Sequence, residues 1–171
     1  MKYKVYIITG APGVGKSTIA EKLRELYPHS FFIDIDVFRK QVGKVDMNLH
    51  DQDYLKTLDI VANNVRFLLE NDLYLPIFVF DCLSPKNIDS FVEAIGNKGE
   101  IKQIVLWMGN DLLKERITSR VGHFYYDFEN AKKMNDWFFE YRDTKHDDFL
   151  FLDRSEFDVE KTVERIVMEV M

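Results

Sequence analysis

A glycine-rich stretch near the start of the chain has the residue types and spacing needed to bind phosphate. Residues 10–18 read GAPGVGKST, which fits the pattern G-x-x-x-x-G-K-[ST] at every fixed position. In such a P-loop, backbone N–H groups and the positive end of the following helix attract a phosphate chain. The lysine reaches the β- and γ-phosphates, and the serine hydroxyl ligates Mg²⁺. The pattern therefore predicts a nucleotide site made of Gly10, Ala11, Pro12, Gly13, Val14, Gly15, Lys16, Ser17 and Thr18.

Three aspartates end apolar runs that we predict to be buried strands. Asp34 and Asp36 close the run 30–36, SFFIDID, and strand alternation would put both on one face, with Arg39 close by. Asp81 closes the run 75–81, LPIFVFD. Ligands in open α/β sheets bind at the carboxyl ends of strands. Asp34 and Asp36 are thus either site residues or a solvated acidic turn, and Asp81 either holds Mg²⁺ through water or caps the next helix.

Two arginines lie four residues apart on a helix predicted over residues 110–120. Arg116 and Arg120 would share one face of this helix. Such a pair is often simply solvent-exposed. In a P-loop protein, an arginine-bearing lid after the fourth strand can instead supply charge to a transferring phosphoryl group. We therefore expect a lid over about residues 116–128.

Alternating strands and helices must position these side chains. Apolar runs predict strands over residues 5–8, 30–36, 75–81, 101–108 and 149–152, and helical spacing predicts helices between and after them. The prediction is a three-layer α/β/α P-loop NTPase fold with a five-stranded, mostly parallel sheet. We see no linker or repeat, so residues 1–171 are expected to form a single domain.

Composition limits the kinds of partner. The net charge of −6 argues against broad binding to nucleic acid backbones. Cys82 is the only cysteine, which excludes an intrachain disulfide and favours a cytoplasmic location. No apolar run approaches the length of a membrane span, and no signal peptide is expected.

Taken in order, these motifs resemble those of the small P-loop kinases, a group that includes shikimate kinase, gluconate kinase, the chloramphenicol phosphotransferase type and the kinase half of polynucleotide kinase. The resemblance covers nearly the whole chain. It rests on GAPGVGKST at 10–18, DIDVFR at 34–39, VFD at 79–81, RITSR at 116–120 and FLFLDRS at 149–155. It implies an enzyme that uses ATP and Mg²⁺ to phosphorylate a hydroxyl of a small molecule.

The resemblance also implies individual roles. Asp36 matches the acid that takes the proton of the acceptor hydroxyl, Asp34 matches the acid nearer the metal, and Arg39 looks like a substrate anchor. The other implied contacts are with the nucleotide, from Arg116 against the adenine, Arg120 on the phosphates and the segment Asp153–Ser155, with Arg154, beside the adenine. Residues 40–50 and the aromatic cluster 124–128 match no substrate motif of these families.

Other functions remain open at this point. A nucleoside, nucleotide or polynucleotide kinase would differ only in its acceptor. A regulatory GTPase should carry N-K-x-D after a strand, whereas this chain has only Asn48-Leu49-His50-Asp51. A nucleotide-binding protein without transfer activity is a further class. The sequence names neither the acceptor nor the oligomeric state.

Overall fold

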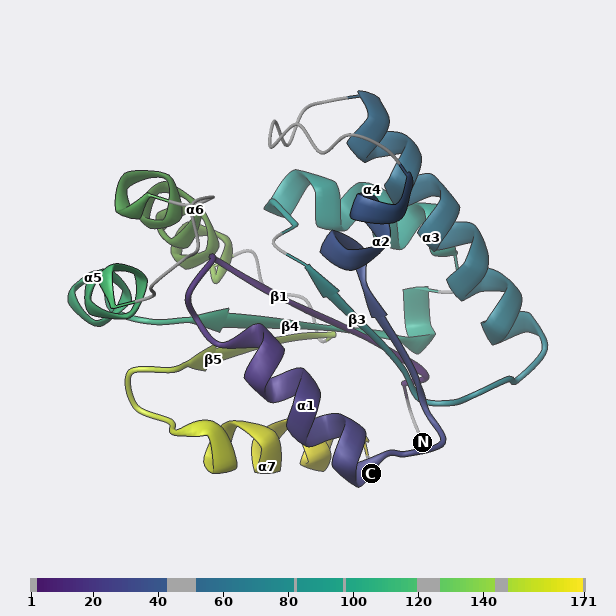
Figure 1. Ribbon diagram of the computed structural model, residues 1–171. Helices are drawn as coiled ribbons and strands as arrows, with labels where there is room; N and C mark the ends of the chain where they lie inside the picture. Colours follow the sequence, from purple (N-terminus) through teal and green to yellow (C-terminus); the bar gives the residue numbers. More distant parts are fainter. Residues whose placement is uncertain are drawn as a thin grey trace.

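The computed structural model describes residues 3–42, 52–81, 83–96, 98–119, 127–143 and 148–170. Strands and helices alternate along this part of the chain (Figure 1). The strands are β1 (Val5–Gly10), β2 (Phe31–Asp34), β3 (Ile77–Asp81), β4 (Ile101–Trp107) and β5 (Phe149–Asp153). The α-helices are α1 (Lys16–Leu26), α2 (Ile35–Val42), α3 (Gln52–Glu70), α4 (Pro85–Ile95), α5 (Asn110–Thr118), α6 (Phe128–Tyr141) and α7 (Val159–Val170), and a 3₁₀ turn spans Lys98–Glu100.

The five strands form one sheet in the order β2-β3-β1-β4-β5. Every neighbouring pair is parallel, so the sheet is wholly rather than mostly parallel. β1 lies at the centre, paired with β3 on one side and β4 on the other. In a parallel sheet all carboxyl ends face the same edge, so the end of β1 lies beside the ends of β3 and β4, and β2 ends at the same edge one strand further out. The predicted α/β P-loop fold is confirmed.

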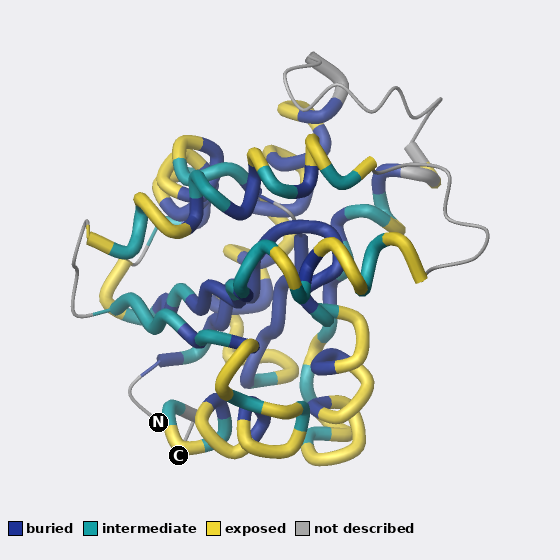
Figure 2. Tube along the Cα trace, turned by 90° about the vertical axis from the view of Figure 1, so that its left-hand side faces the viewer, coloured by how far each residue is buried: buried dark blue, intermediate teal, exposed yellow. Residues whose placement is uncertain are grey.

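Two apolar layers cover the sheet. Tyr6 and Ile8 of β1 pack into a core with residues of α1 and α7, whereas Val5 and Ile7 pack into a second core with α3 and α4. This alternation is what a strand buried on both faces requires. Figure 1 shows α1 and α7 below the strands and α3 and α4 above them, and Figure 2 shows buried strands between helices whose outer sides are exposed. None of the helices in the described ranges is long and apolar enough to cross a membrane.

The predicted strand over residues 30–36 is wrong beyond Asp34. The chain turns into α2 at Ile35, so Asp34 and Asp36 do not share a strand face. The Oδ1 atom of Asp34 accepts a hydrogen bond from the N–H of Val37 at 3.2 Å, which satisfies a free donor of the first helical turn. Asp36 lies in that turn, where the helix dipole favours negative charge. Local capping therefore outweighs the apolar alternation that predicted a longer strand.

Candidate active site

The P-loop joins the end of the central strand to the start of α1 and depends on glycine. Gly10 has a φ of +149°, and a Cβ atom there would lie 2.2 Å from the carbonyl oxygen of Leu106 on β4. Gly15 precedes α1 with a φ of +101°, in the left-handed region. Any larger residue at Gly10 would push the loop away from the sheet. The loop is thus held close to the carboxyl edge, with the N-terminus of α1 directed at it.

Lys16 folds back over this loop. Its Nζ donates hydrogen bonds to the carbonyl oxygens of Gly10 at 2.8 Å and Ala11 at 3.1 Å. The next two residues, Ser17 and Thr18, are exposed in the first turn of α1. The ammonium group therefore lies within the loop, and the two hydroxyls lie where a bound nucleotide and its metal can reach them.

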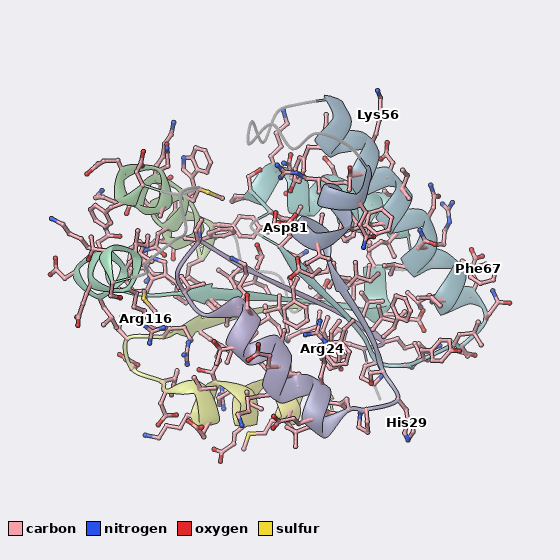
Figure 3. The ribbon with its side chains drawn as sticks, in the orientation of Figure 1. Arg24, His29, Lys56, Phe67, Asp81 and Arg116 are labelled. Carbon is pink, nitrogen blue, oxygen red and sulfur yellow. The ribbon has the colours of Figure 1, made fainter. Side chains whose placement is uncertain are left out.

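The guanidinium groups of Arg116 and Arg154 both lie close to Gly15 of the P-loop. A Cβ atom on Gly15 would lie 3.6 Å from Nη1 of Arg116 and 3.7 Å from Nη2 of Arg154. Burial, and then the positive charge of Arg116, lower the pKa of Arg154 below its usual range. Arg116 lies on α5, on the side toward α1 (Figure 3). Like charges held this close favour an anion between them, so the arrangement fits a phosphate chain.

Arg154 is also a structural clamp, a role that the sequence did not indicate. Its side chain is only 3% exposed. Nε donates to the carbonyl oxygen of Val14 at 3.4 Å, and Nη1 donates to the carbonyl oxygen of Phe157 at 2.8 Å. Nη1 also contacts the carbonyl oxygen of Asp158 and the hydroxyl of Thr162. One guanidinium therefore ties the P-loop to the start of α7.

Asp81 is buried at the end of β3, in register with Thr9 of β1 (Figure 3). It is 3% exposed, and its Oδ2 accepts a hydrogen bond from the hydroxyl of Tyr54 at 3.0 Å. Asp81 is not the cap of α4, because the Oγ of Ser84 accepts the N–H of Asn87 there at 3.4 Å. One of the two predicted roles of Asp81 is thereby removed.

Arg39 and Asp36 lie on α2, one helical turn apart. Nη1 of Arg39 is 3.8 Å from Oδ1 of Asp36, and the guanidinium lies 5.1 Å from the centre of the Tyr54 ring. Arg39 is 7% exposed, whereas the side chain of Asp36 is 39% exposed. Tyr54 thus connects the arginine to Asp81. From the sequence Tyr54 is simply one apolar position on the face of a helix, and no motif distinguishes it.

A groove of about 680 Å³ begins at the P-loop end of α1. Ser17 and Asp34 lie at this end, next to the P-loop. It continues along the edge strand β2, between α1 on one side and α2 and α3 on the other. The described residues that line it are Ser17, Ala20, Glu21, Arg24, Phe31, Phe32, Ile33, Asp34, Val37, Phe38, Gln41, Val61, Asn64, Phe67 and Leu68.

Some predicted site residues lie outside the described ranges: Arg120, residues 43–50 and residues 124–126, with most of the predicted lid. α5 ends at Thr118, two residues before the end of the predicted helix.

Within the described ranges, no three His, Cys, Asp or Glu side chains gather closely enough to bind a metal ion. The donors that fit Mg²⁺ are the Ser17 hydroxyl and the carboxylates of Asp34 and Asp81, with the nucleotide phosphates as further ligands.

Comparison with known proteins identifies a matching family and structures with the same fold. A family model described as "AAA domain" matches residues 5–141. Three solved structures share the fold. A sugar kinase from Janibacter sp. HTCC2649 has 18% identity over 98% of this chain and 95% of its own, with a TM-score of 0.73. A gluconokinase from Sinorhizobium meliloti 1021 has 17% identity over 99% and 92%, with a TM-score of 0.65. Shikimate kinase from Bacteroides thetaiotaomicron has 17% identity over 96% and 98%, with a TM-score of 0.62.

Proposed function

Because the chain belongs to the AAA-domain family and folds like small P-loop kinases, we propose that it transfers the γ-phosphoryl group of ATP to a hydroxyl of a small molecule. One observation carries the proposal. A P-loop flanked by two guanidinium groups lies at the same sheet edge as the carboxylates that end β2 and β3, Asp34 and Asp81. A site that bound phosphate with neither a metal ion nor a proton transfer would need the cations but not the acids.

The donor half of the site would work mainly by charge. When bound, ATP supplies the phosphoryl group, and Mg²⁺ neutralises part of its charge. Lys16 moves from the loop carbonyls to the β- and γ-phosphates, and Arg116 contacts the nucleotide. Ser17, Asp34 and Asp81 are the residues that would hold the metal ion. Arg120 is proposed to stabilise charge on the transferring group.

The acceptor half would orient and deprotonate the hydroxyl. The acceptor oxygen forms a bond to the γ-phosphorus while the bond from that phosphorus to the β-phosphate oxygen breaks, and ADP leaves. The hydroxyl proton passes to the carboxylate of Asp36. Arg39, which lies against Tyr54 with Nη1 3.8 Å from Oδ1 of Asp36, is proposed to anchor the acceptor beside that carboxylate.

The test is the variant Asp36→Asn, assayed with Mg²⁺ and ATP against a panel of sugar acids, shikimate, nucleosides, nucleoside monophosphates, chloramphenicol and a 5′-hydroxyl oligonucleotide. Mass spectrometry detects the phosphorylated product. We expect the variant to lower turnover by at least about 100-fold, the usual contribution of a general base, while calorimetry shows unchanged affinity for a non-hydrolysable ATP analogue.

Asp59→Asn is the matched control. Asp59 is exposed on α3, and this substitution removes the same charge as Asp36→Asn does. It should leave turnover unchanged. Full activity in Asp36→Asn would refute the role of Asp36. ATP binding by the wild-type chain without any phosphorylated product would favour a nucleotide-binding switch instead. Phosphorylation of a nucleoside or of the oligonucleotide alone would favour a nucleoside kinase or a polynucleotide kinase, respectively.

A further inference from the structure

Tyr54 lies where the core of the protein meets the proposed metal site. Tyr54, Leu58, Val61 and Val65 belong to the buried face of α3, which packs in one core with residues of the sheet. Unlike the other three, Tyr54 carries a hydroxyl group, and a buried hydroxyl needs a hydrogen-bond partner. This hydroxyl donates to Oδ2 of Asp81 at 3.0 Å. One residue of the core therefore contacts a carboxylate that is proposed to hold Mg²⁺.

The side chain of Asp81 is placed between this helix layer and the P-loop. Ile77 and Val79 of β3 pack in the core that contains α3 and α4, and strand alternation puts Asp81 on the same face. Asp81 is also in register with Thr9, the residue that precedes the first glycine of the P-loop. Neighbouring strands lie about 4.8 Å apart. The carboxylate is therefore one strand away from the P-loop, and its hydrogen bond from Tyr54 comes from the helix layer.

Packing fixes the position of the Tyr54 hydroxyl. The tyrosine is 2% exposed, and the guanidinium of Arg39, itself 7% exposed, lies 5.1 Å from the centre of its ring. The hydroxyl lies on the axis about which a tyrosine ring flips, so its position depends on where the ring is packed. A donor held in this way can fix the orientation of the Asp81 carboxylate. A carboxylate has about four acceptor sites, and this hydrogen bond uses one of them.

We propose that Tyr54 is a positioning residue, whose hydroxyl holds the Asp81 carboxylate in the orientation that receives Mg²⁺ beside the P-loop. The inference rests on the proposed function, which assigns Asp81 to the metal ion. Hydrogen-bond partners of metal-binding carboxylates orient these groups, and their loss lowers metal affinity by about 10- to 100-fold. If Tyr54 only satisfied a buried carboxylate, its loss would lower the stability of the fold and leave the response to Mg²⁺ unchanged.

The experiment measures the affinity of the non-hydrolysable ATP analogue by calorimetry, with Mg²⁺ and with EDTA, and compares the ratio of the two affinities between variants. We expect Tyr54→Phe, which keeps the ring and removes the hydroxyl, to lower this ratio by about tenfold. Thermal unfolding checks that each variant folds.

Tyr6→Phe is the matched control. Tyr6 is fully buried in the core on the opposite face of the sheet, and its hydroxyl donates to the carbonyl oxygens of Tyr3 and Glu169. Tyr6→Phe therefore also removes a buried tyrosine hydroxyl, but far from Asp81 in the sheet layers. It should lower Tm and leave the Mg²⁺-to-EDTA ratio at the wild-type value.

A double variant tests whether Tyr54 acts through Asp81. Asp81→Asn alone should lower the ratio, and adding Tyr54→Phe to it should lower the ratio no further. Additive losses would overturn the inference, because Tyr54 would then act by another route. If Asp81→Asn does not fold, the comparison of Tyr54→Phe with Tyr6→Phe decides the question.

Three other results would also overturn the inference. They are a ratio in Tyr54→Phe within about twofold of wild type, an equal loss in Tyr54→Phe and Tyr6→Phe, and a wild-type affinity that is the same in Mg²⁺ and EDTA. No acceptor is present in these titrations, so they do not depend on phosphoryl transfer. The absence of a phosphorylated product from the acceptor panel would refute the proposed transfer, whereas the Mg²⁺-to-EDTA ratio alone decides the role of Tyr54.

Discussion

Replacing Arg154 by methionine separates two roles for this residue. The resemblance to kinases assigns its segment to the adenine, whereas in the structure its guanidinium joins the P-loop to α7 through Val14, Phe157 and Thr162. Arg154→Met keeps much of the apolar stem and removes every donor. If the clamp is the main role, the variant loses stability even without nucleotide.

The magnitude follows from the contacts. Hydrogen bonds from a charged donor are worth about 1.5–3 kcal/mol each. The carbonyl of Asp158 keeps other donors, because the N–H and hydroxyl of Thr162 also reach it, but Phe157 and Val14 lose the contact from Arg154. Methionine also removes the cost of burying the charge. We therefore expect a net loss of about 3 kcal/mol, which for a domain of this size lowers Tm by about 6–12 °C.

The assay is thermal unfolding followed by circular dichroism, without and with saturating ATP analogue and Mg²⁺. Arg165→Met is the control, since Arg165 is an exposed arginine on α7. It should leave Tm near the wild-type value. A ligand-free Tm of Arg154→Met within about 2 °C of wild type, with nucleotide affinity reduced, would refute the clamp and return Arg154 to the adenine.

Further predictions concern the loop, the buried carboxylate and a surface ion pair. Lys16→Ala should weaken binding of the ATP analogue by at least about tenfold in calorimetry, because the ammonium is proposed to contact two phosphates. It should also lower Tm, because the carbonyl oxygens of Gly10 and Ala11 lose the hydrogen bonds that Lys16 donates. Tyr54→Phe should cost about 1–2 kcal/mol in urea unfolding, because Asp81 is buried and loses the hydroxyl donor. The hydrogen bond from Lys132 lowers the pKa of Asp136. This pair therefore stabilises the fold above the ordinary pKa of an aspartate and ceases to do so as the pH falls through the lowered value. Asp136→Asn should slightly reduce Tm at pH 7, and the difference from wild type should shrink as the pH falls below the ordinary pKa of an aspartate; the effect is small because the pair is partly exposed.

The elements that could be predicted from the sequence are those whose position depends on the types of a few neighbouring residues. The run at 101–108, the helix over 85–95 with Ser84 and Pro85 at its start, and the P-loop all lie where they were expected. Their signals are apolar runs, caps and glycine spacing, each of which is contained in a few neighbouring residues.

Features that depend on distant contacts could not be predicted in this way. β2 ends early because the Asp34 side chain can cap a helix, a choice that the alternating run did not reveal. The link from Tyr54 to Asp81 spans α3 and β3, and nothing in either segment alone indicates it. The clamp at Arg154 likewise depends on Val14, which lies in a different part of the chain. The groove exists only because α1 and α3 lie on opposite sides of one edge strand.

The central position of β1 has a consequence for how the chain acquires its site during synthesis. Val5 pairs with Ile77 and with Ile101, so both neighbours of the first strand are made long after it. Contacts between such distant residues form slowly, since a long loop must close before they contribute. The P-loop, although encoded at the start, reaches the geometry described above only when β4 has emerged and Leu106 lies against Gly10. We therefore expect the chain to bind nucleotide only after most of the sheet has formed. A nascent chain that stops before Ile101 should not retain ATP.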